Sequence, residues 1–233
     1  MSKPRPRNAS KGTKAADLLK TSFMIRIPRN RDEWVAEGVD WLKTIVVVMV
    51  VFLPTITFVV QGYRIPSSSM ENTLLIGDFL FADKITYGAR IPLFEGSRVP
   101  GLRDPEPGDI VIFKKPGTGP GAGETLIKRC VAAAGQVIEV RGREVYVDGE
   151  LQEEPYTKFT RRVRNPRTDN FGPYRVPDDH IFCMGDNRDN SFDSRFFGPV
   201  PMSLVIAKAD ILYFSFNKEN FLPRLNRIGK MLH

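Results

Sequence analysis

Histidine and cysteine are scarce in this sequence, with two of each among 233 residues. His233 is the last residue and His180 lies between an acidic pair and an apolar run, so a Ser-His-Asp triad would depend on His180 alone. Cys130 and Cys183 are too few for a disulfide framework, and the sequence leaves open whether they are a bonded pair or two buried thiols. A serine nucleophile in this chain would therefore need another kind of base.

Basic residues exceed acidic ones, but the excess is concentrated at one end. The formal net charge is +7, and residues 1–43 hold ten Lys or Arg against five acids, which leaves only +2 for the rest of the chain. A basic end next to an apolar segment favours a cytoplasmic flank in contact with anionic lipids over a groove for nucleic acid. We therefore expect residues 1–40 to form a basic cytoplasmic lead, and we expect no nucleic acid to bind.

Charged residues are absent between Thr44 and Val60, where the sequence is almost continuously apolar. Counted from 41 to 63, the segment supplies the ~20 residues that a spanning helix needs, with Trp41 and Tyr63 placed for the two interfaces. A buried core helix is disfavoured because the segment has no polar stripe. A cleaved signal peptide is disfavoured because the charged lead is long and no small-x-small cleavage signature follows. We predict an uncleaved, single-pass anchor at 41–63 with a cytoplasmic N-terminus, because the basic residues precede it.

A long amphipathic helix is absent from the remainder of the sequence. Short apolar or alternating runs are separated by turn residues, and both Gly142 and the pair Asp148–Gly149 signal hairpins. The sequence therefore predicts one mainly β, barrel-like or sandwich-like domain over residues 64–233, outside the membrane. The segment at about 148–178 is long for a simple loop and is expected to form a surface insertion.

Two loops have the composition of ligand sites but lack the required spacing. The glycine-rich residues 117–123 have neither the Lys-Ser/Thr ending of a phosphate-binding loop nor a helix pattern after them. Residues 186–193 have the acidic composition of a calcium loop without a glycine at the sixth position or a glutamate at the twelfth. We therefore expect no metal and no cofactor.

Three consecutive serines lie a few residues beyond the predicted anchor, between Pro66 and Met70. We predict that Ser69 is a nucleophile, and its hydroxyl needs a neighbouring base. Lys128 is the main candidate, because in a strand it shares a face with the apolar Leu126. If that face is buried, desolvation would lower the pKa of Lys128 enough for a neutral amine to be present. The pattern alone leaves open the alternative of a solvated strand lysine.

Four motifs follow the anchor, at 66–74, 108–114, 127–129 and 185–195, and the last begins with the specific sequence Gly-Asp-Asn-Arg-Asp-Asn-Ser. In type and order they resemble the extracytoplasmic motifs of type I signal peptidase, or leader peptidase. The resemblance implies a mainly β, membrane-bound Ser-Lys dyad endopeptidase of the bacterial cytoplasmic membrane. Such an enzyme removes signal peptides from exported preproteins after Ala-x-Ala sites, with membrane lipids and the secretion translocon as further partners.

The resemblance also implies catalytic roles. Ser69 would be the nucleophile and Lys128 the general base, while the amide of Ser69 and the hydroxyl of Ser67 would stabilise the oxyanion. Ser191 would hydrogen-bond to Lys128 and orient it. The sequence departs from many relatives at Asn72, where they have proline, so the turn after the nucleophile is expected to be less rigid.

Further residues are implied to support the site. Asp193 and Arg195 would pair and brace the loop that carries Ser191. Shallow apolar pockets for small substrate side chains would be lined by Ile65, Met70, Leu74, Leu80, Ile112, Leu126 and Ile127. A cytosolic self-cleaving Ser-Lys repressor would need a DNA-binding helical domain, which the sequence does not show. A membrane-tethered β module that binds exported chains without cutting them is the rival from another class.

Overall fold

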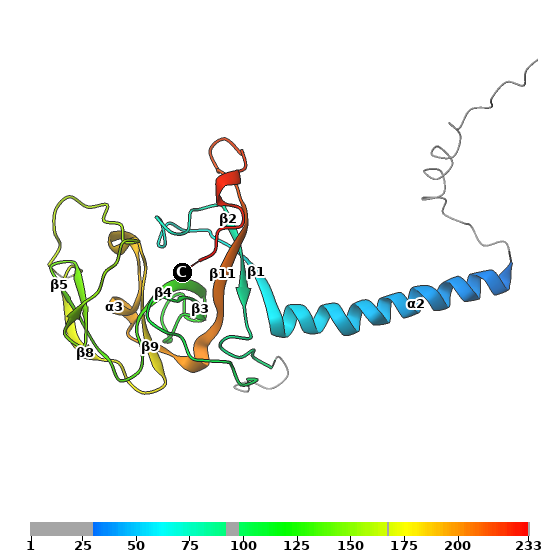
Figure 1. Ribbon diagram of the computed structural model, residues 1–233, viewed down its shortest axis with the longest axis horizontal. Coiled ribbons are helices and arrows are strands. Elements are labelled where there is room, and N and C mark those ends of the chain that lie inside the picture. The colour runs from blue at the N-terminus through cyan, green and yellow to red at the C-terminus, as the bar shows by residue number, and fades with distance from the viewer. Residues whose placement is uncertain (1–29, 92–97, 167, 233) are drawn as a thin grey trace, which may run out of the picture. The chain divides into compact units, whose positions relative to one another are not determined.

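The computed structural model describes residues 30–91, 98–166 and 168–232, so most of the predicted basic lead lies outside the described residues. The chain divides into two compact units, residues 1–50 and 51–233. The first described element is helix α2, Arg31–Pro54 (Figure 1). Within the apolar segment, the hydroxyl of Thr55 donates to the carbonyl of Val51 at 2.7 Å, so this polar side chain is satisfied inside the helix.

The apolar segment changes conformation after Pro54. A π-helical turn, η1, covers Thr55–Val59, and strand β1 follows at Val60–Arg64. The segment Trp34–Val59 is long and apolar enough to cross a membrane, and its most apolar 18-residue stretch has a mean hydropathy of 2.3. The prediction that the anchor extends to Tyr63 is wrong at its C-terminal end, because β1 pairs with the next strand and Tyr63 packs against the core of the β unit.

The second unit is built from two antiparallel sheets, which confirms the mainly β prediction. The larger sheet has the order β1-β2-β11-β3-β4-β9-β10 and curls into a half-barrel. Its further strands are β2 Asp78–Asp83, β3 Ile110–Lys114, β4 Thr125–Ala132, β9 His180–Met184, β10 Val200–Pro201 and β11 Val205–Ser215. Register shifts in β11 after Ala209 and Leu212 are bulges, which bend a strand and increase its twist.

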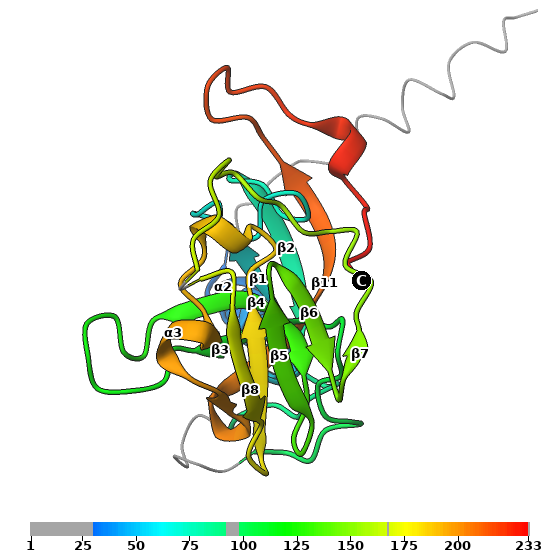
Figure 2. The ribbon, with the colours of Figure 1, turned by 90° about the vertical axis from the view of Figure 1, so that its left-hand side faces the viewer.

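The smaller sheet has the order β7-β6-β5-β8, and Figure 2 shows its central strands side by side. Its strands are β5 Val137–Arg141, β6 Glu144–Val147, β7 Glu150–Leu151 and β8 Phe171–Arg175. The predicted hairpin turns are confirmed, since Gly142 and Asp148–Gly149 connect paired strands with positive φ angles. The segment predicted as a surface insertion supplies β7 and β8 to this sheet.

Short helical turns complete the β unit. They are η2 Arg188–Asn190, α3 Ser194–Phe197, η3 Met202–Leu204 and η4 Leu225–Arg227. One apolar core cluster joins the loop after β1 to strands β2, β3 and β11, with Ile127 of β4 packed against it. This cluster supports both the loop that carries Ser69 and the strand that carries Lys128.

Candidate active site

The loop between β1 and β2 positions Ser69. A helical turn forms there because the amide of Leu74 donates to the carbonyl of Met70 at 2.7 Å, and both apolar side chains are fully buried. Asn72 has a φ of 106°, a conformation that the ring of proline excludes. The side-chain amide of Asn72 donates to the carbonyl of Tyr156 at 3.0 Å, so a distant segment of the chain holds this turn.

Lys128 of β4 points at Ser69. The Lys128 Nζ donates to the Ser69 Oγ at 2.5 Å, and Lys128 is only 3% exposed. Burial lowers the pKa of Lys128 from 10.5 to about 8, against the opposing effects of Asp193 and Asp186. Within the described part of the chain the ammonium group forms no ion pair. The alternative of a solvated lysine is therefore wrong, and a fraction of about a tenth of neutral amine is expected at pH 7.

The loop after β9 holds the nucleophile from the other side. The amide of Asn187 donates to the carbonyl of Ser69 at 3.1 Å, and the side-chain amides of Asn187 and Asn190 donate to the carbonyl and hydroxyl of Ser68. A Cβ at Gly185 would lie 2.6 Å from the Ser69 carbonyl oxygen and 2.3 Å from the Ser191 Oγ. Only glycine therefore allows this close approach.

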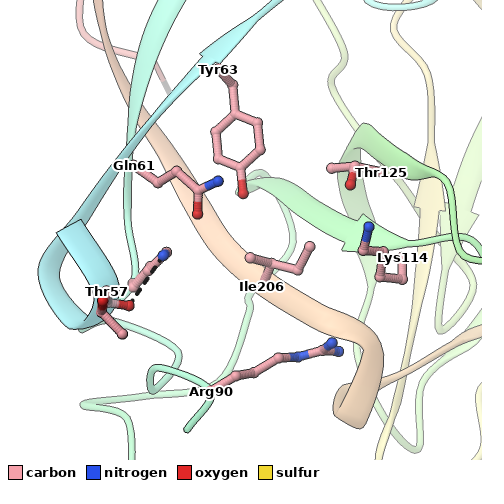
Figure 3. Close-up of a pocket in the computed structure, with 8 residues that line it drawn as sticks. Thr57, Gln61, Tyr63, Arg90, Lys114, Thr125 and Ile206 are labelled. Atoms are coloured by element: carbon pink, nitrogen blue, oxygen red, sulfur yellow. Dashed lines mark hydrogen bonds between the residues drawn. The ribbon is translucent and has the colours of Figure 1, made fainter. Parts of the chain in front are cut away.

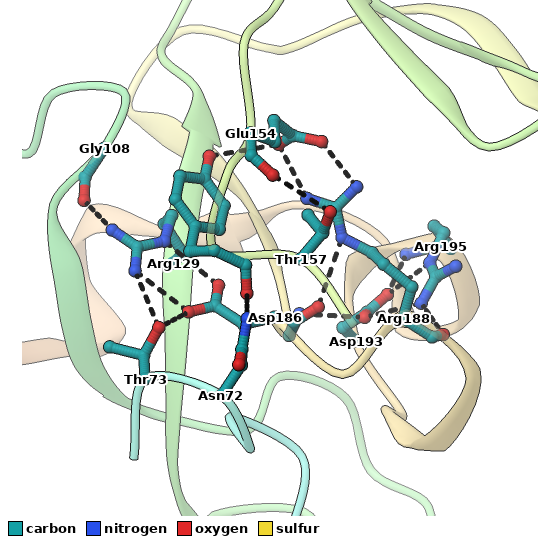
Figure 4. A network of polar contacts seen from close by, with 12 residues as sticks. Asn72, Thr73, Gly108, Arg129, Glu154, Thr157, Asp186, Arg188, Asp193 and Arg195 are labelled. Carbon is teal, nitrogen blue, oxygen red and sulfur yellow. Dashed lines mark hydrogen bonds and ion pairs between the residues drawn. The ribbon is translucent and has the colours of Figure 1, made fainter. Parts of the chain in front are cut away.

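A buried ionic network adjoins the dyad, and sequence reasoning assigned it no role (Figure 4). Arg129 is 1% exposed and binds both carboxylate oxygens of Asp186, at 3.0 and 2.9 Å. Arg129 also donates to the Gly108 carbonyl at 2.7 Å and stacks on the Tyr156 ring at 3.8 Å. The hydroxyl of Thr73 donates to Asp186 at 2.5 Å. The network thus ties the nucleophile loop to β4 and to the loop after β9.

The predicted support residues are only partly arranged as expected. Arg195 forms a two-pronged ion pair with Asp193, with both contacts at 2.9 Å. Asp193 also accepts the Gly185 amide at 3.1 Å, so the pair braces the glycine that touches the nucleophile loop. The expected hydrogen bond from Ser191 to Lys128 is not formed, because the buried Ser191 Oγ has no partner among the described residues. The Ser191 side chain instead packs closely against Gly185, where an added Cβ would lie 2.3 Å from the Ser191 Oγ.

The remaining groups lie around the dyad with different exposure. Ser67 is exposed, and the amide of Ser69 donates no hydrogen bond to a described residue. Cys130 and Cys183 face each other across β4 and β9 as free, buried thiols, and burial raises the pKa of both. The role of the Ser67 hydroxyl and the Ser69 amide as oxyanion donors stays a prediction, whereas the two buried thiols are inert.

The predicted pocket residues divide into two groups. Five are at most 2% exposed and belong to the core beneath the site, and their role in lining shallow pockets for substrate side chains stays a prediction: these are Ile65, Met70, Leu74, Leu80 and Ile112. Leu126 and Ile127 are half-buried and flank the dyad on β4, so they remain available to a substrate side chain.

A serine hydroxyl held against a buried, partly deprotonated lysine on a curled β sheet defines the Ser-Lys class of serine hydrolases. A family model described as signal peptidase, peptidase S26, matches residues 38–214. The chain is 35% identical over 179 residues to a probable signal peptidase I-2 of Synechocystis, and the match covers 75% of this chain and 73% of the relative. It is 30% identical over 226 residues to signal peptidase I of Pseudomonas fluorescens, with coverages of 82% and 78%.

A solved structure is also similar. The crystal structure of a signal peptidase I from Enterococcus faecalis is 28% identical, with a TM-score of 0.38, and the match covers 46% of this chain and 98% of that one. On the sequence comparisons, the chain belongs to the signal peptidase family, peptidase S26.

Proposed function

We propose that the chain is a membrane-anchored serine endopeptidase that removes N-terminal signal peptides from exported preproteins. The observation that carries the proposal is the 2.5 Å contact between the Lys128 Nζ and the Ser69 Oγ inside a buried site. Family membership supports the substrate class. The binding module without activity is disfavoured, because a buried lysine with a lowered pKa costs stability, and among the described residues its ammonium hydrogen-bonds to the Ser69 hydroxyl alone.

The chemistry follows from the dyad. Neutral Lys128 accepts the proton of Ser69 as the Oγ attacks the scissile carbonyl, and a covalent ester with the substrate forms. The proton then passes to the leaving amine, and a water activated by Lys128 hydrolyses the ester. The Ser69 amide and the Ser67 hydroxyl stabilise the oxyanion. Ser191, whose hydroxyl is unpaired at rest, accepts a hydrogen bond from protonated Lys128 during the reaction.

Substrate choice is set by space and location. Small side chains fit beside Leu126 and Ile127 without displacing the closed core, which favours an Ala-x-Ala cleavage site. The apolar segment that ends at Val59 keeps Ser69 within ~35 Å of the membrane surface, since ten residues at ~3.5 Å each separate them. A signal peptide anchored in the same bilayer therefore meets the site at a raised effective concentration.

The orientation and cellular location are part of the same proposal. The basic N-terminal segment stays in the cytoplasm of a bacterium, and the β unit lies on the outer side of the cytoplasmic membrane. Membrane lipids and the secretion translocon are its neighbours there. A reporter fused after residue 233 should be active only on the outer side, and activity on the cytoplasmic side would contradict this orientation.

The direct test is cleavage of a preprotein by the purified full-length chain in lipid vesicles. We expect one cut after an Ala-x-Ala site, identified by mass spectrometry of the mature N-terminus. Ser69→Ala and Lys128→Ala should each lower kcat/KM by more than about 10³-fold. Lys128→Arg is the matched control, because it keeps the positive charge but cannot release its proton near neutrality. Equal cleavage by these variants and the native chain would contradict the proposal.

A further inference from the structure

A second hollow lies in the β unit, away from the dyad (Figure 3). It has a volume of about 320 Å³ and neither dyad residue lines it. Its walls come from η1, β1, β3, β4 and β11 and from the loop after β2. The lining residues are Thr57, Gln61, Tyr63, Lys84, Arg90, Lys114, Thr125 and Ile206. Figure 3 shows the hydroxyl of Tyr63 and the side chains of Arg90 and Lys114 around the same space.

The lining of this hollow is strongly basic. Lys84, Arg90 and Lys114 are its charged residues, and none of the three forms an ion pair with a residue that the structure describes. Among the described residues, the Lys84 ammonium donates to two backbone carbonyls, and Arg90 donates to the carbonyl of Ser203. Desolvation lowers the pKa of both Lys84 and Arg90, so an anion between them would offset the cost of keeping them charged.

The position of the hollow indicates which anion it meets. Thr57 belongs to the candidate membrane span Trp34–Val59, and the Lys84 Nζ donates to the carbonyls of Ile56 and Thr57, each at 3.1 Å. Residues at the end of a spanning segment lie at the level of the lipid headgroups. The basic groups therefore lie where lipid phosphates are concentrated, whichever side of the membrane the β unit occupies.

We propose that this pocket binds the phosphodiester group of an anionic phospholipid such as phosphatidylglycerol. The planar guanidinium of Arg90 suits two phosphate oxygens, and the ammonium groups of Lys84 and Lys114 supply point charges. Tyr63 adds a neutral donor, and Ile206 gives an apolar contact for the glycerol or acyl chain. The same basic groups would repel the quaternary ammonium of phosphatidylcholine, so the site discriminates between the two lipids.

The test measures lipid binding without any substrate, so its outcome is independent of peptidase activity. The full-length chain in neutral detergent is titrated with phosphatidylglycerol and with phosphatidylcholine of the same acyl chains, and bound lipid is counted by native mass spectrometry. We expect phosphatidylglycerol to bind at least tenfold more tightly. Arg90→Gln and Lys114→Gln should each weaken its binding by about tenfold. The exposed Arg162→Gln is the matched control and should leave the affinity unchanged.

Lys114→Gln is the more stringent variant, because the Lys114 ammonium makes no side-chain hydrogen bond or ion pair with a described residue, so its loss breaks none. Unchanged thermal unfolding of this variant excludes misfolding as the cause. Equal affinity for the two lipids would overturn the proposal, as would displacement of the lipid by millimolar inorganic phosphate. It would also be overturned if the two pocket variants kept the native affinity for phosphatidylglycerol.

Discussion

Two consecutive residues of β4 are buried cations in opposite situations. Arg129 is 1% exposed, binds Asp186 through two contacts and stacks on Tyr156, while Lys128 is 3% exposed and its ammonium has the Ser69 hydroxyl as its one hydrogen-bond partner among the described residues. Successive side chains of a strand point to opposite faces, so the two environments are separate. One cation has a carboxylate partner, whereas the other has none among the described residues and its pKa falls to about 8.

The contrast distinguishes the charge of Arg129, which holds the structure together, from that of Lys128, which we propose acts in catalysis. Compensation by a carboxylate would hold the lysine protonated and remove the base, so the site must leave Lys128 without such a partner. The arginine network, in turn, supplies the rigidity that holds the nucleophile loop against the lysine. Asp186 also acts on Lys128 at longer range, since its charge opposes the lowering of the lysine pKa.

The largest effect is expected from removing the compensation of Arg129. Asp186→Asn leaves a buried guanidinium without its counter-ion, which should lower the free energy of unfolding by about 3–5 kcal/mol. Chemical denaturation of the full-length protein measures this. Combining it with Arg129→Met should recover part of the loss, because the uncompensated charge is then gone. A double variant less stable than Asp186→Asn would contradict this account.

Replacing Lys128 by an apolar residue is expected to stabilise the protein, whereas Asp186→Asn destabilises it. Its pKa is lowered in the folded state relative to 10.5, so the charged form destabilises the fold at every pH below about 8. Lys128→Met should therefore raise the free energy of unfolding by roughly 2–3 kcal/mol at pH 7. The advantage should shrink as the pH rises from about 8 to 10.5, where the native amine loses its proton in both states. An advantage that is independent of pH would show that packing, not charge, causes it.

A smaller effect on stability is expected from a substitution at Gly185, in the loop after β9. Gly185→Ala would place a Cβ 2.6 Å from the Ser69 carbonyl, so the nucleophile loop must shift. We expect a loss of about 1–3 kcal/mol in stability and a fall of about tenfold to a hundredfold in kcat. Gly119→Ala is the control, because a Cβ there meets nothing within 4 Å. A native kcat in Gly185→Ala would exclude this coupling.

The smallest structural effect is expected at Ser191. Its hydroxyl has no partner among the described residues, so Ser191→Ala should change the free energy of unfolding by less than about 0.5 kcal/mol. Its kcat should nevertheless fall by about tenfold, because protonated Lys128 would lose an acceptor during the reaction. A destabilisation above about 1 kcal/mol would mean that the hydroxyl is already bonded in the resting protein.

The sequence predicted those parts of the molecule that local pattern determines. The alternation around Lys128, the hairpin residues Gly142 and Asp148–Gly149, and the order of the motifs led to the β fold and to the residues of the dyad. The C-terminal end of the anchor was misplaced because an apolar, β-branched run such as Phe58–Val60 suits a helix and a strand equally well. Only pairing with β2 decides between them.

Other features depend on long-range packing that no local pattern reports. Met70 and Leu80 are buried in a core that strands β2, β3 and β11 form together, and bulges in β11 bend one of these strands. The contact of Gly185 with Ser69 joins segments more than a hundred residues apart. The Arg129 and Asp186 network could have been suspected from its place inside two matching motifs, but the pairing itself required coordinates.

The pH dependence of kcat/KM tests most directly whether burial makes Lys128 the base. The rate should rise as the neutral amine forms, with an apparent pKa of about 8 in the free enzyme, and level off above it. Asp186→Asn, if folded, should shift this limb to lower pH, since one carboxylate that favours the protonated amine is lost. A limb near 10.5, the value of an exposed lysine, would contradict the account.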